Sequence, residues 1–432
     1  MDDRTACLEA ERPAVEKRSG VGGLDDGLAL SLSAAMGSVA GLIGWVVSTR
    51  LLTPSDIGKA AEVVAAILMI GGIAQLNLSV GMLRWIPVAG RYTARLTWVG
   101  MLTVIPLGAL AALVCVVVLP SIGATAAGGL PWWVGAALFV VVTAGWTVFV
   151  VHDTLLVALG KPWWAVWRNA LFAAVRLGLM IVLGLVGLGA QAIVLSWVLP
   201  IVVWIGLGSV ALVVMTRAVS RRSRDGALPG WRPAAAFLGP TSVAELGPAL
   251  LYNVVTVIVT ERFGSATGAL FFMAWQAVTV VDVSASFFMK SLVVGLAREP
   301  GRAAELAAAT RRRLLMIFLP LLALGCLIAG PALGLVFGAE YAAAADVLRL
   351  LLVGLALRLV VLIELGVRQA LGRAYAYARL QLLSSVTVVI AVALVPAGAA
   401  DVDALLPVAA VYVTVQLACA VIALRSRRPA VV

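Results

Sequence analysis

The chain has 432 residues, of which 62% are hydrophobic and only 12% are charged, and its formal net charge is +11. Soluble globular domains carry about a quarter charged residues, so a soluble fold of this length is excluded and the lipid bilayer must be the solvent. The positive charge does not indicate a nucleic-acid partner, because the basic residues lie in short clusters at alternate gaps between apolar runs.

A mixed-charge segment precedes twelve apolar runs. Residues 1–27 have no apolar core and place acids just before the first run, so we expect a disordered cytoplasmic tail and no signal peptide. The later runs have about the length of a helix that crosses a bilayer. They cover 29–49, 58–80, 96–120, 132–152, 169–190, 192–215, 235–259, 267–292, 312–335, 345–366, 377–397 and 404–424. The sequence predicts an all-α integral membrane protein with twelve transmembrane helices.

The basic residues predict the orientation of these helices. If the N-terminus is inside, the inner segments hold 25 of the 32 Lys and Arg residues, and the outer segments hold only Arg50, Lys59 and Arg262. Cytoplasmic loops of membrane proteins carry such an excess. We therefore expect both termini in the cytoplasm, with six-helix units at 28–215 and 233–424, a basic cytoplasmic linker at 216–232 and a short tail at 425–432.

The two halves resemble each other locally. The turn Thr53-Pro54-Ser55 joins the first two runs, and Ser55 and Gly58 match Ser265 and Gly268 at an offset of 210. A second match, between residues 158–161 and 370–373, follows the fourth and tenth runs. Both runs point inward, so the halves are expected to be parallel repeats related by an axis along the membrane normal.

Cysteine and histidine usage predicts no metal site and no cofactor. The four cysteines are scattered, without disulfide or metal-ligand spacing, and His152 is the single histidine. We interpret His152 and Asp153, at the inner end of the fourth run, as a solvated helix boundary.

Charged residues inside apolar runs are the candidate functional residues, because each is costly in a bilayer. Arg176 lies near the middle of the fifth run, and Arg168 lies on the same helix face. They would form a cationic track for an anionic substrate, or they would pin helices together through backbone carbonyls. Arg358 in the tenth run allows the same two interpretations. Arg84, at a helix end, is a further substrate-binding candidate or a residue that follows the positive-inside rule.

The seventh and eighth runs carry the other candidates. Trp275, Thr279, Asp282, Ser286 and Lys290 form a polar stripe typical of a cavity-facing helix. Asp282 and Lys290 would contact substrate or a proton, or would fix packing as paired charges. Glu245 lies beside the helix-breaking Pro248 and is the candidate for a proton- or cation-linked carboxylate, together with Asp282. The alternative for Glu245 is a structural partner of Lys290 or Arg358.

Three segments carry a resemblance to a known family. They are LLTPSDIGKA with its ending LNLSVGMLRWIP, then LGKPWWAVWRNALFAAVRL at 159–177, and Phe337-Gly338-Ala339-Glu340-Tyr341 followed by Asp346-Val347-Leu348-Arg349. In this order they resemble the polysaccharide transporters, the lipid-linked oligosaccharide flippases of the MOP (MATE-like) exporter superfamily. The resemblance implies two six-helix lobes around a central cavity, transport without ATP hydrolysis, and a substrate with a polyprenyl tail, a pyrophosphate and a sugar.

The leading hypothesis is therefore a flippase for a polyprenyl-pyrophosphate-linked oligosaccharide in the cytoplasmic membrane of a bacterium, used for cell-surface polysaccharide synthesis. Its expected partners are membrane lipids, the lipid-linked saccharide, and glycosyltransferases and a polymerase of the same pathway. A cation-coupled drug antiporter of the same superfamily is the alternative, although embedded bases outnumber clearly embedded acids. A membrane polymerase or glycosyltransferase is disfavoured because the longest outer segment, 121–131, has no acid/base pair. We expect no enzyme activity.

Overall fold

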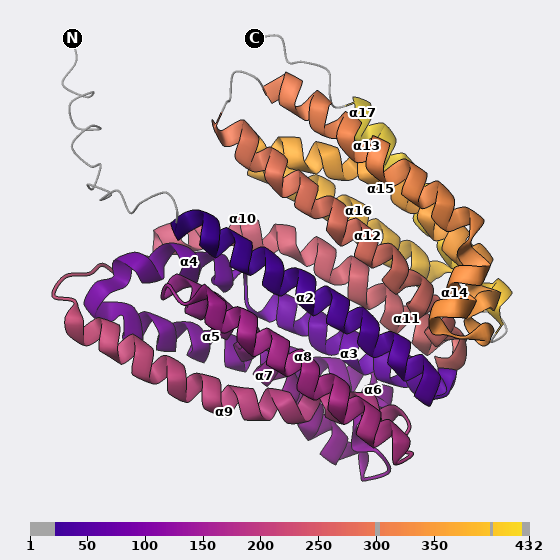
Figure 1. The fold of residues 1–432 in the computed structure, drawn as a ribbon, viewed down its shortest axis with the longest axis horizontal. Helices are drawn as coiled ribbons and strands as arrows, with labels where there is room; N and C mark the ends of the chain where they lie inside the picture. The colour runs from indigo at the N-terminus through magenta and orange to yellow at the C-terminus, as the bar shows by residue number, and fades with distance from the viewer. Residues whose placement is uncertain (1–21, 299–302, 398–400, 426–432) are drawn as a thin grey trace.

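The computed structural model describes residues 22–298, 303–397 and 401–425, and every element in these ranges is a helix. The predicted tail at 1–27 and the end of the chain after 425 lie almost wholly outside the described residues. Figure 1 shows the N-terminal helices α2–α9 packed beside the C-terminal helices α10–α17. We call these two groups the N lobe and the C lobe.

The helix bounds follow the predicted runs closely. The N lobe comprises α2 (Gly22–Leu51), α3 (Pro54–Ala74), α4 (Leu78–Ala89), α5 (Thr93–Val118), α6 (Pro120–Ala127), α7 (Trp132–Ala158), α8 (Pro162–Leu185) and α9 (Ala190–Arg222), with a short 3-10 turn η1 (Gly90–Tyr92). The C lobe comprises α10 (Trp231–Ala249), the π-helical segment η2 (Leu250–Val254), α11 (Val255–Phe263), α12 (Ser265–Arg298), α13 (Ala303–Leu327), α14 (Ala329–Phe337), α15 (Ala345–Ala370), α16 (Ala374–Leu394) and α17 (Leu406–Arg425), with 3-10 turns η4 (Ala339–Ala344) and η5 (Val402–Leu405).

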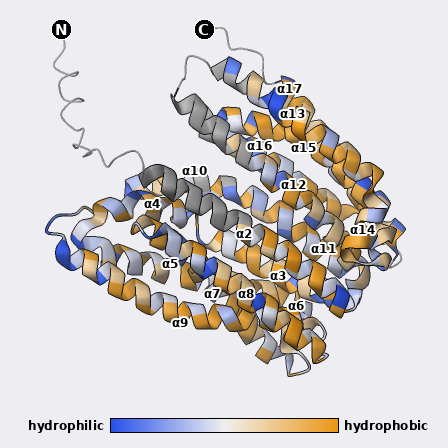
Figure 2. Cartoon of the chain, in the orientation of Figure 1, coloured by the Kyte–Doolittle hydropathy of each residue, from blue (hydrophilic) through white to orange (hydrophobic). Residues whose placement is uncertain are grey.

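The described helices have the length and composition of membrane spans. Nine are long and apolar enough to cross a bilayer, and the number rises to eleven if each of two bent helix pairs is one span. Hydrophobic residues also lie on the outside of the molecule, for example along α9, which Figure 2 colours mostly as hydrophobic. Many large hydrophobic side chains are exposed, among them Leu335 at 80% and Leu185 at 72%, and so extensive an apolar surface is typical of a protein that faces lipid. The predicted class, an all-α integral membrane protein, is confirmed.

The predicted turn at Thr53-Pro54-Ser55 begins α3. Thr53 Oγ1 accepts a hydrogen bond from the backbone N–H of Asp56 at 3.2 Å, and Pro54 occupies the first turn, where its missing N–H has no cost. Capping of this kind is local, which explains why the sequence predicts the boundary.

The two matching segments of the internal repeat contact each other. Ser55 Oγ and Ser265 Oγ lie 2.9 Å apart, at the starts of α3 and α12. A Cβ added to Gly58 would lie 1.8 Å from the carbonyl oxygen of Ser265, so only glycine permits this approach. The contact joins the lobes at the end of the molecule opposite the start of α2 and the end of α17 (Figure 1). We call it the closed end.

Two helix breaks lie within the predicted runs 58–80 and 235–259, and the sequence indicated only the second of them, through Pro248. The run 58–80 is divided because Leu76 and Asn77 adopt left-handed conformations, with φ of 47° and 52°, between α3 and α4. In the C lobe, Pro248 lacks the backbone N–H that an α-helix needs, and the π-helical turn η2 follows it directly. Both breaks free backbone groups inside the membrane, which is tolerated where they are buried in protein or line a cavity.

Candidate functional site

A polar cavity of about 230 Å³ lies between the lobes, and both helix breaks line it. Gln75 and Asn77 contribute from the break between α3 and α4, and Glu245, Tyr252 and Asn253 contribute from α10 and η2. Helix breaks bring backbone carbonyls and side-chain amides to mid-depth, where an unbroken helix would present only side chains. This cavity can therefore bind a polar group inside an otherwise apolar bundle.

Tyr252 connects the cavity to a buried ion pair in the C lobe. Its hydroxyl donates a hydrogen bond to Asp282, and Arg358 Nε lies 2.8 Å from Asp282 Oδ2. The side chains of Arg358 and Asp282 are only 1% and 2% exposed. A further hydrogen bond of 3.5 Å joins Arg358 Nη2 to the hydroxyl of Tyr252. The three side chains form one network, contributed by η2, α12 and α15.

This network is not fully satisfied. Asp282 Oδ1 and Arg358 Nη1 are buried and have no hydrogen-bond partner among the described residues. An unpaired buried group costs about 1–3 kcal/mol, and more when it is charged. Buried polar atoms without a partner indicate that an additional polar ligand binds there or that the site is strained. Tyr252 lines the interlobe cavity and also contacts both Asp282 and Arg358. A ligand that binds in the cavity and contacts Tyr252 would therefore change the surroundings of the ion pair.

The predicted site residues of the C lobe are thus only partly brought together. Glu245 has an exposed side chain that lines the interlobe cavity, and Asp282 reaches that cavity only through Tyr252. Arg358 is committed to Asp282 and would contact a substrate only after that pair separates. Lys290 lies on α12, but its side chain is outside the described residues. The proposed substrate and coupling roles of these residues remain predictions.

Arg176 lies in a different environment, between α2, α8 and α9 of the N lobe. Its guanidinium stacks over Trp197, 4.6 Å from the ring centroid, and Nη2 donates a long hydrogen bond of 3.4 Å to the carbonyl of Ala40. A Cβ added to Gly44 would lie 3.1 Å from Nη2, so glycine makes room for the arginine. No acidic residue of the described ranges forms an ion pair with Arg176. Within the part of the chain that the structure describes, Arg176 is therefore a cation without a protein anion.

Arg84 and Arg168 differ from Arg176 in their contacts. Arg84 on α4 is exposed, and its guanidinium lies 4.8 Å from the centroid of Phe237 on α10. Arg168 is buried, pairs with Asp153 at 2.6 Å, and donates to the carbonyl of Phe149 at 3.0 Å. These contacts join α8 to α7, which is the helix-pinning alternative for Arg168.

The interpretation of His152 as a solvated boundary is wrong. His152 is 1% exposed, and a Cβ on Gly208 would lie 2.7 Å from its Nδ1. α9 packs over the inner end of α7 at Gly208 and covers the imidazole. His152 is buried because α7 continues to Ala158, beyond the predicted end of the run 132–152, so the imidazole lies within the helix and not at its end.

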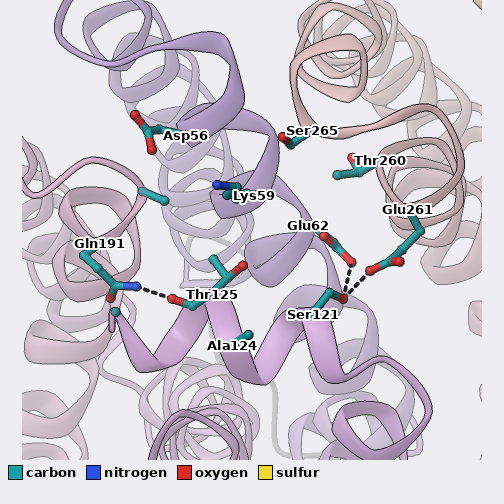
Figure 3. Close-up of a pocket in the computed structure, with 12 residues that line it drawn as sticks. Asp56, Lys59, Glu62, Ser121, Ala124, Thr125, Gln191, Thr260, Glu261 and Ser265 are labelled. Atoms are coloured by element: carbon teal, nitrogen blue, oxygen red, sulfur yellow. Dashed lines mark hydrogen bonds between the residues drawn. The ribbon is translucent and has the colours of Figure 1, made fainter. Parts of the chain in front are cut away.

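Sequence reasoning missed a second polar pocket, of about 490 Å³, at the closed end. Figure 3 shows Ser121 between the carboxyl groups of Glu62 and Glu261. Glu62 is 4% exposed on α3, Ser121 lies on α6, and Glu261 is exposed on α11. The available signal was Glu62 itself, an acid inside the apolar run 58–80. Its partner Glu261 lies near the end of α11, where a charged residue is common and does not by itself indicate a functional site.

Neither a known protein-family model nor a curated protein sequence matches the chain. Solved structures do. The inward-facing conformation of a multidrug resistance MATE family transporter of the MOP superfamily matches with a TM-score of 0.63 and 17% identity over 93% of this chain and 97% of that chain.

Two further structures match in the same way. A MOP superfamily transporter from Pyrococcus furiosus, described as having a binding pocket of reverse polarity, gives a TM-score of 0.57 at 16% identity, covering 92% of this chain and 93% of that chain. An outward-facing multidrug resistance MATE family transporter gives 0.56 at 15% identity with the same coverage. The predicted MATE-like fold is thereby confirmed: the chain has the fold of the MATE family transporters of the MOP superfamily.

Proposed function

We propose that the protein is a flippase that moves a polyprenyl-pyrophosphate-linked oligosaccharide across the bacterial cytoplasmic membrane by alternating access. In this proposal both termini are cytoplasmic, and the pathway's glycosyltransferases and polymerase supply and consume the substrate. The sugar and pyrophosphate pass between the lobes while the polyprenyl tail stays in lipid.

The observation that carries the proposal is the environment of Arg176. Its guanidinium is embedded in the N lobe, and no ion pair neutralises it among the described residues. An unneutralised charge inside a membrane protein is costly, so a ligand anion is a reasonable partner. The planar donor fork of arginine suits the oxygens of a pyrophosphate. Arg358, in contrast, is already neutralised by Asp282.

Alternating access is supported by how the lobes meet. At the closed end, Ser55 contacts Ser265, and Arg50 Nη2 donates to the carbonyls of Leu335 and Val336. These hydrogen bonds join small or exposed groups and can be exchanged for bonds to water when the end opens, while apolar contacts such as Trp45 against Phe272 would also have to separate. The higher TM-score against the inward-facing neighbour agrees with a molecule closed at this end.

A cation-coupled antiporter of drugs or other small molecules is the second candidate. Glu245 favours it, because a carboxylate lining the interlobe cavity suits a cationic substrate better than an anionic one. Two of the structural neighbours are multidrug resistance transporters, although the likeness to them is one of fold.

Assays in reconstituted proteoliposomes distinguish the two functions. Flipping is measured with a fluorescent label on the saccharide head, whose fluorescence becomes accessible to a membrane-impermeant quencher as the lipid crosses the membrane. Antiport is measured as movement of a cationic dye driven by an imposed ion gradient. Hydrogen bonds to charged groups contribute about 1.5–3 kcal/mol, so Arg176→Ala should slow flipping about ten- to a hundredfold. Arg176→Lys should retain more activity, since it keeps the charge and loses only the fork.

The matched control is Arg349→Ala, because Arg349 is 44% exposed, pairs with Asp346 three residues earlier and otherwise donates to the carbonyl of Cys326 at 3.1 Å. This variant should flip at the wild-type rate. Membrane abundance separates a helix-pinning role of Arg176 from ligand binding, since pinning predicts loss of folded protein. Normal flipping by Arg176→Ala would overturn the anion-binding role. Dye antiport that Glu245→Gln abolishes, without any saccharide flipping, would establish the second candidate instead.

A further inference from the structure

If both carboxyls of the acidic pair at the closed end are ionised, one proton is lacking for its two hydrogen bonds. Ser121 Oγ lies 3.4 Å from Glu62 Oε1 and within hydrogen-bond distance of Glu261 Oε1. A hydroxyl has one hydrogen, so it can donate to one carboxylate only. The other carboxyl must donate to the hydroxyl oxygen, and it can do so only when it carries a proton.

No basic residue replaces that proton. Among the described residues, neither Glu62 nor Glu261 forms an ion pair. Lys59 lines the same pocket one turn before Glu62, and Arg262 lies beside Glu261, but neither comes within ion-pair distance. The other titratable groups facing the pair are Asp56 on α3 and Cys115 on α5, and the described residues that α6, α9 and α12 contribute to the pocket are uncharged.

A second polar group points to a small ligand at this place. The Oγ1 atom of Thr260 is buried and has no hydrogen-bond partner within the described part of the chain, although Thr260 lines the same pocket and is only 5% exposed. Glu62 is also almost completely buried, so its charged form is penalised by loss of water. Glu261 is exposed, so the pair exchanges protons with the solution at the closed end.

The three groups bridge the two lobes. Glu62 and Ser121 belong to the N lobe, and Glu261 belongs to the C lobe at the end of α11 (Figure 3). The bridge lies in the same pocket as Ser265, whose hydroxyl contacts Ser55 across the lobes. Opening this end must separate Glu261 from Ser121.

We propose that Glu62, Ser121 and Glu261 form a proton-binding site that holds the closed end shut. With one proton shared, the bridge links the lobes by hydrogen bonds. When the proton leaves, two carboxylates face one hydroxyl across the lobe boundary, and their repulsion favours separation. The basic-residue distribution predicts that this end is outside, so external acidity would favour the conformation open to the other side. The inference needs alternating access but not the saccharide substrate.

The test measures the opening of this end directly. Spin labels on Leu130→Cys and Leu394→Cys, both exposed and on opposite lobes, report the distance across the closed end after the four native cysteines are replaced. The protein is placed in lipid nanodiscs, and distance distributions are recorded from about pH 5 to pH 9 by double electron–electron resonance. One linked proton changes the closed-to-open ratio by at most about tenfold per pH unit.

Wild type should be closed at low pH and gain a longer-distance population as the pH rises. Glu62→Gln and Glu261→Gln should each remain closed throughout, because one carboxylate is lost and the amide can donate to the remaining acid. Glu261→Gln is the safer variant for folding, since Glu261 is exposed. Glu340→Gln, which removes an exposed acid in η4 of the C lobe, should keep the wild-type pH response.

Three results would overturn the proposal. They are a wild-type distribution that does not change with pH, an unchanged response in both glutamine variants, and closure that depends on sodium at fixed pH. Each is independent of saccharide transport. A protein that shows the pH response without flipping the lipid-linked saccharide would refute the proposed substrate and leave the proton site intact.

Discussion

Removing the charge of Arg358 is the perturbation with the largest expected effect on stability. Arg358→Met replaces the guanidinium by a shorter, unbranched apolar side chain and leaves the carboxylate of Asp282 buried, with Tyr252 as its remaining donor among the described residues. Asp282→Asn leaves the guanidinium in the same position without a counter-charge. The double variant removes both charges, so it should lose less stability than the sum of the losses of the two single variants.

The size of the effect follows from the geometry. At 2.8 Å and an effective dielectric constant of about 20, the attraction between Arg358 and Asp282 is about 6 kcal/mol. Desolvation of both groups offsets part of this attraction in the intact pair. Breaking a buried pair by removing one partner costs about 3–5 kcal/mol, whereas replacing both charges by neutral groups costs far less. A double-mutant cycle should therefore give a coupling energy of about 2 kcal/mol or more.

Unfolding by sodium dodecyl sulphate in mixed micelles, followed by fluorescence of the 13 tryptophans, measures these free energies. The control cycle uses Arg349→Met and Asp346→Asn, since that pair is 44% and 72% exposed and should couple by less than about 1 kcal/mol. Additive effects of Arg358→Met and Asp282→Asn would refute the reasoning, because they would mean that the two charges do not stabilise each other.

Two more predictions concern the lobes and their orientation. Gly58→Ala should push the lobes apart at the closed end, at a cost of about 1–3 kcal/mol, because its Cβ would lie 1.8 Å from the Ser265 carbonyl oxygen. Gly72→Ala, whose Cβ would meet a side chain at 3.6 Å, should not; the spin-label distance compares the two, and an unchanged distance in Gly58→Ala would contradict the prediction. In intact cells, an impermeant thiol reagent should label Leu130→Cys and spare Ser223→Cys until the membrane is permeabilised. Early labelling of Ser223→Cys would reverse the predicted orientation.

The sequence by itself determined the protein class, the helical segments and several of their boundaries. These features depend on local properties: a run of apolar residues crosses a bilayer whatever its neighbours are, and Thr53 and Pro54 start α3 through contacts within one turn. Pro248 likewise indicated a break, because it removes its own backbone donor. The internal repeat indicated Ser55 and Ser265 as equivalent positions, although not that their hydroxyl groups touch.

Only the tertiary structure decided which charges meet. Hydropathy gives the depth of a residue in the membrane, but its partner depends on how each helix is rotated and which helices are neighbours. Arg176 and Arg358 looked alike in sequence, yet one faces Trp197 and the other is paired with Asp282. Glu62 and Glu261 come from separate lobes and share a hydroxyl of α6. Such contacts between distant segments are fixed by packing, which no local pattern of residues encodes.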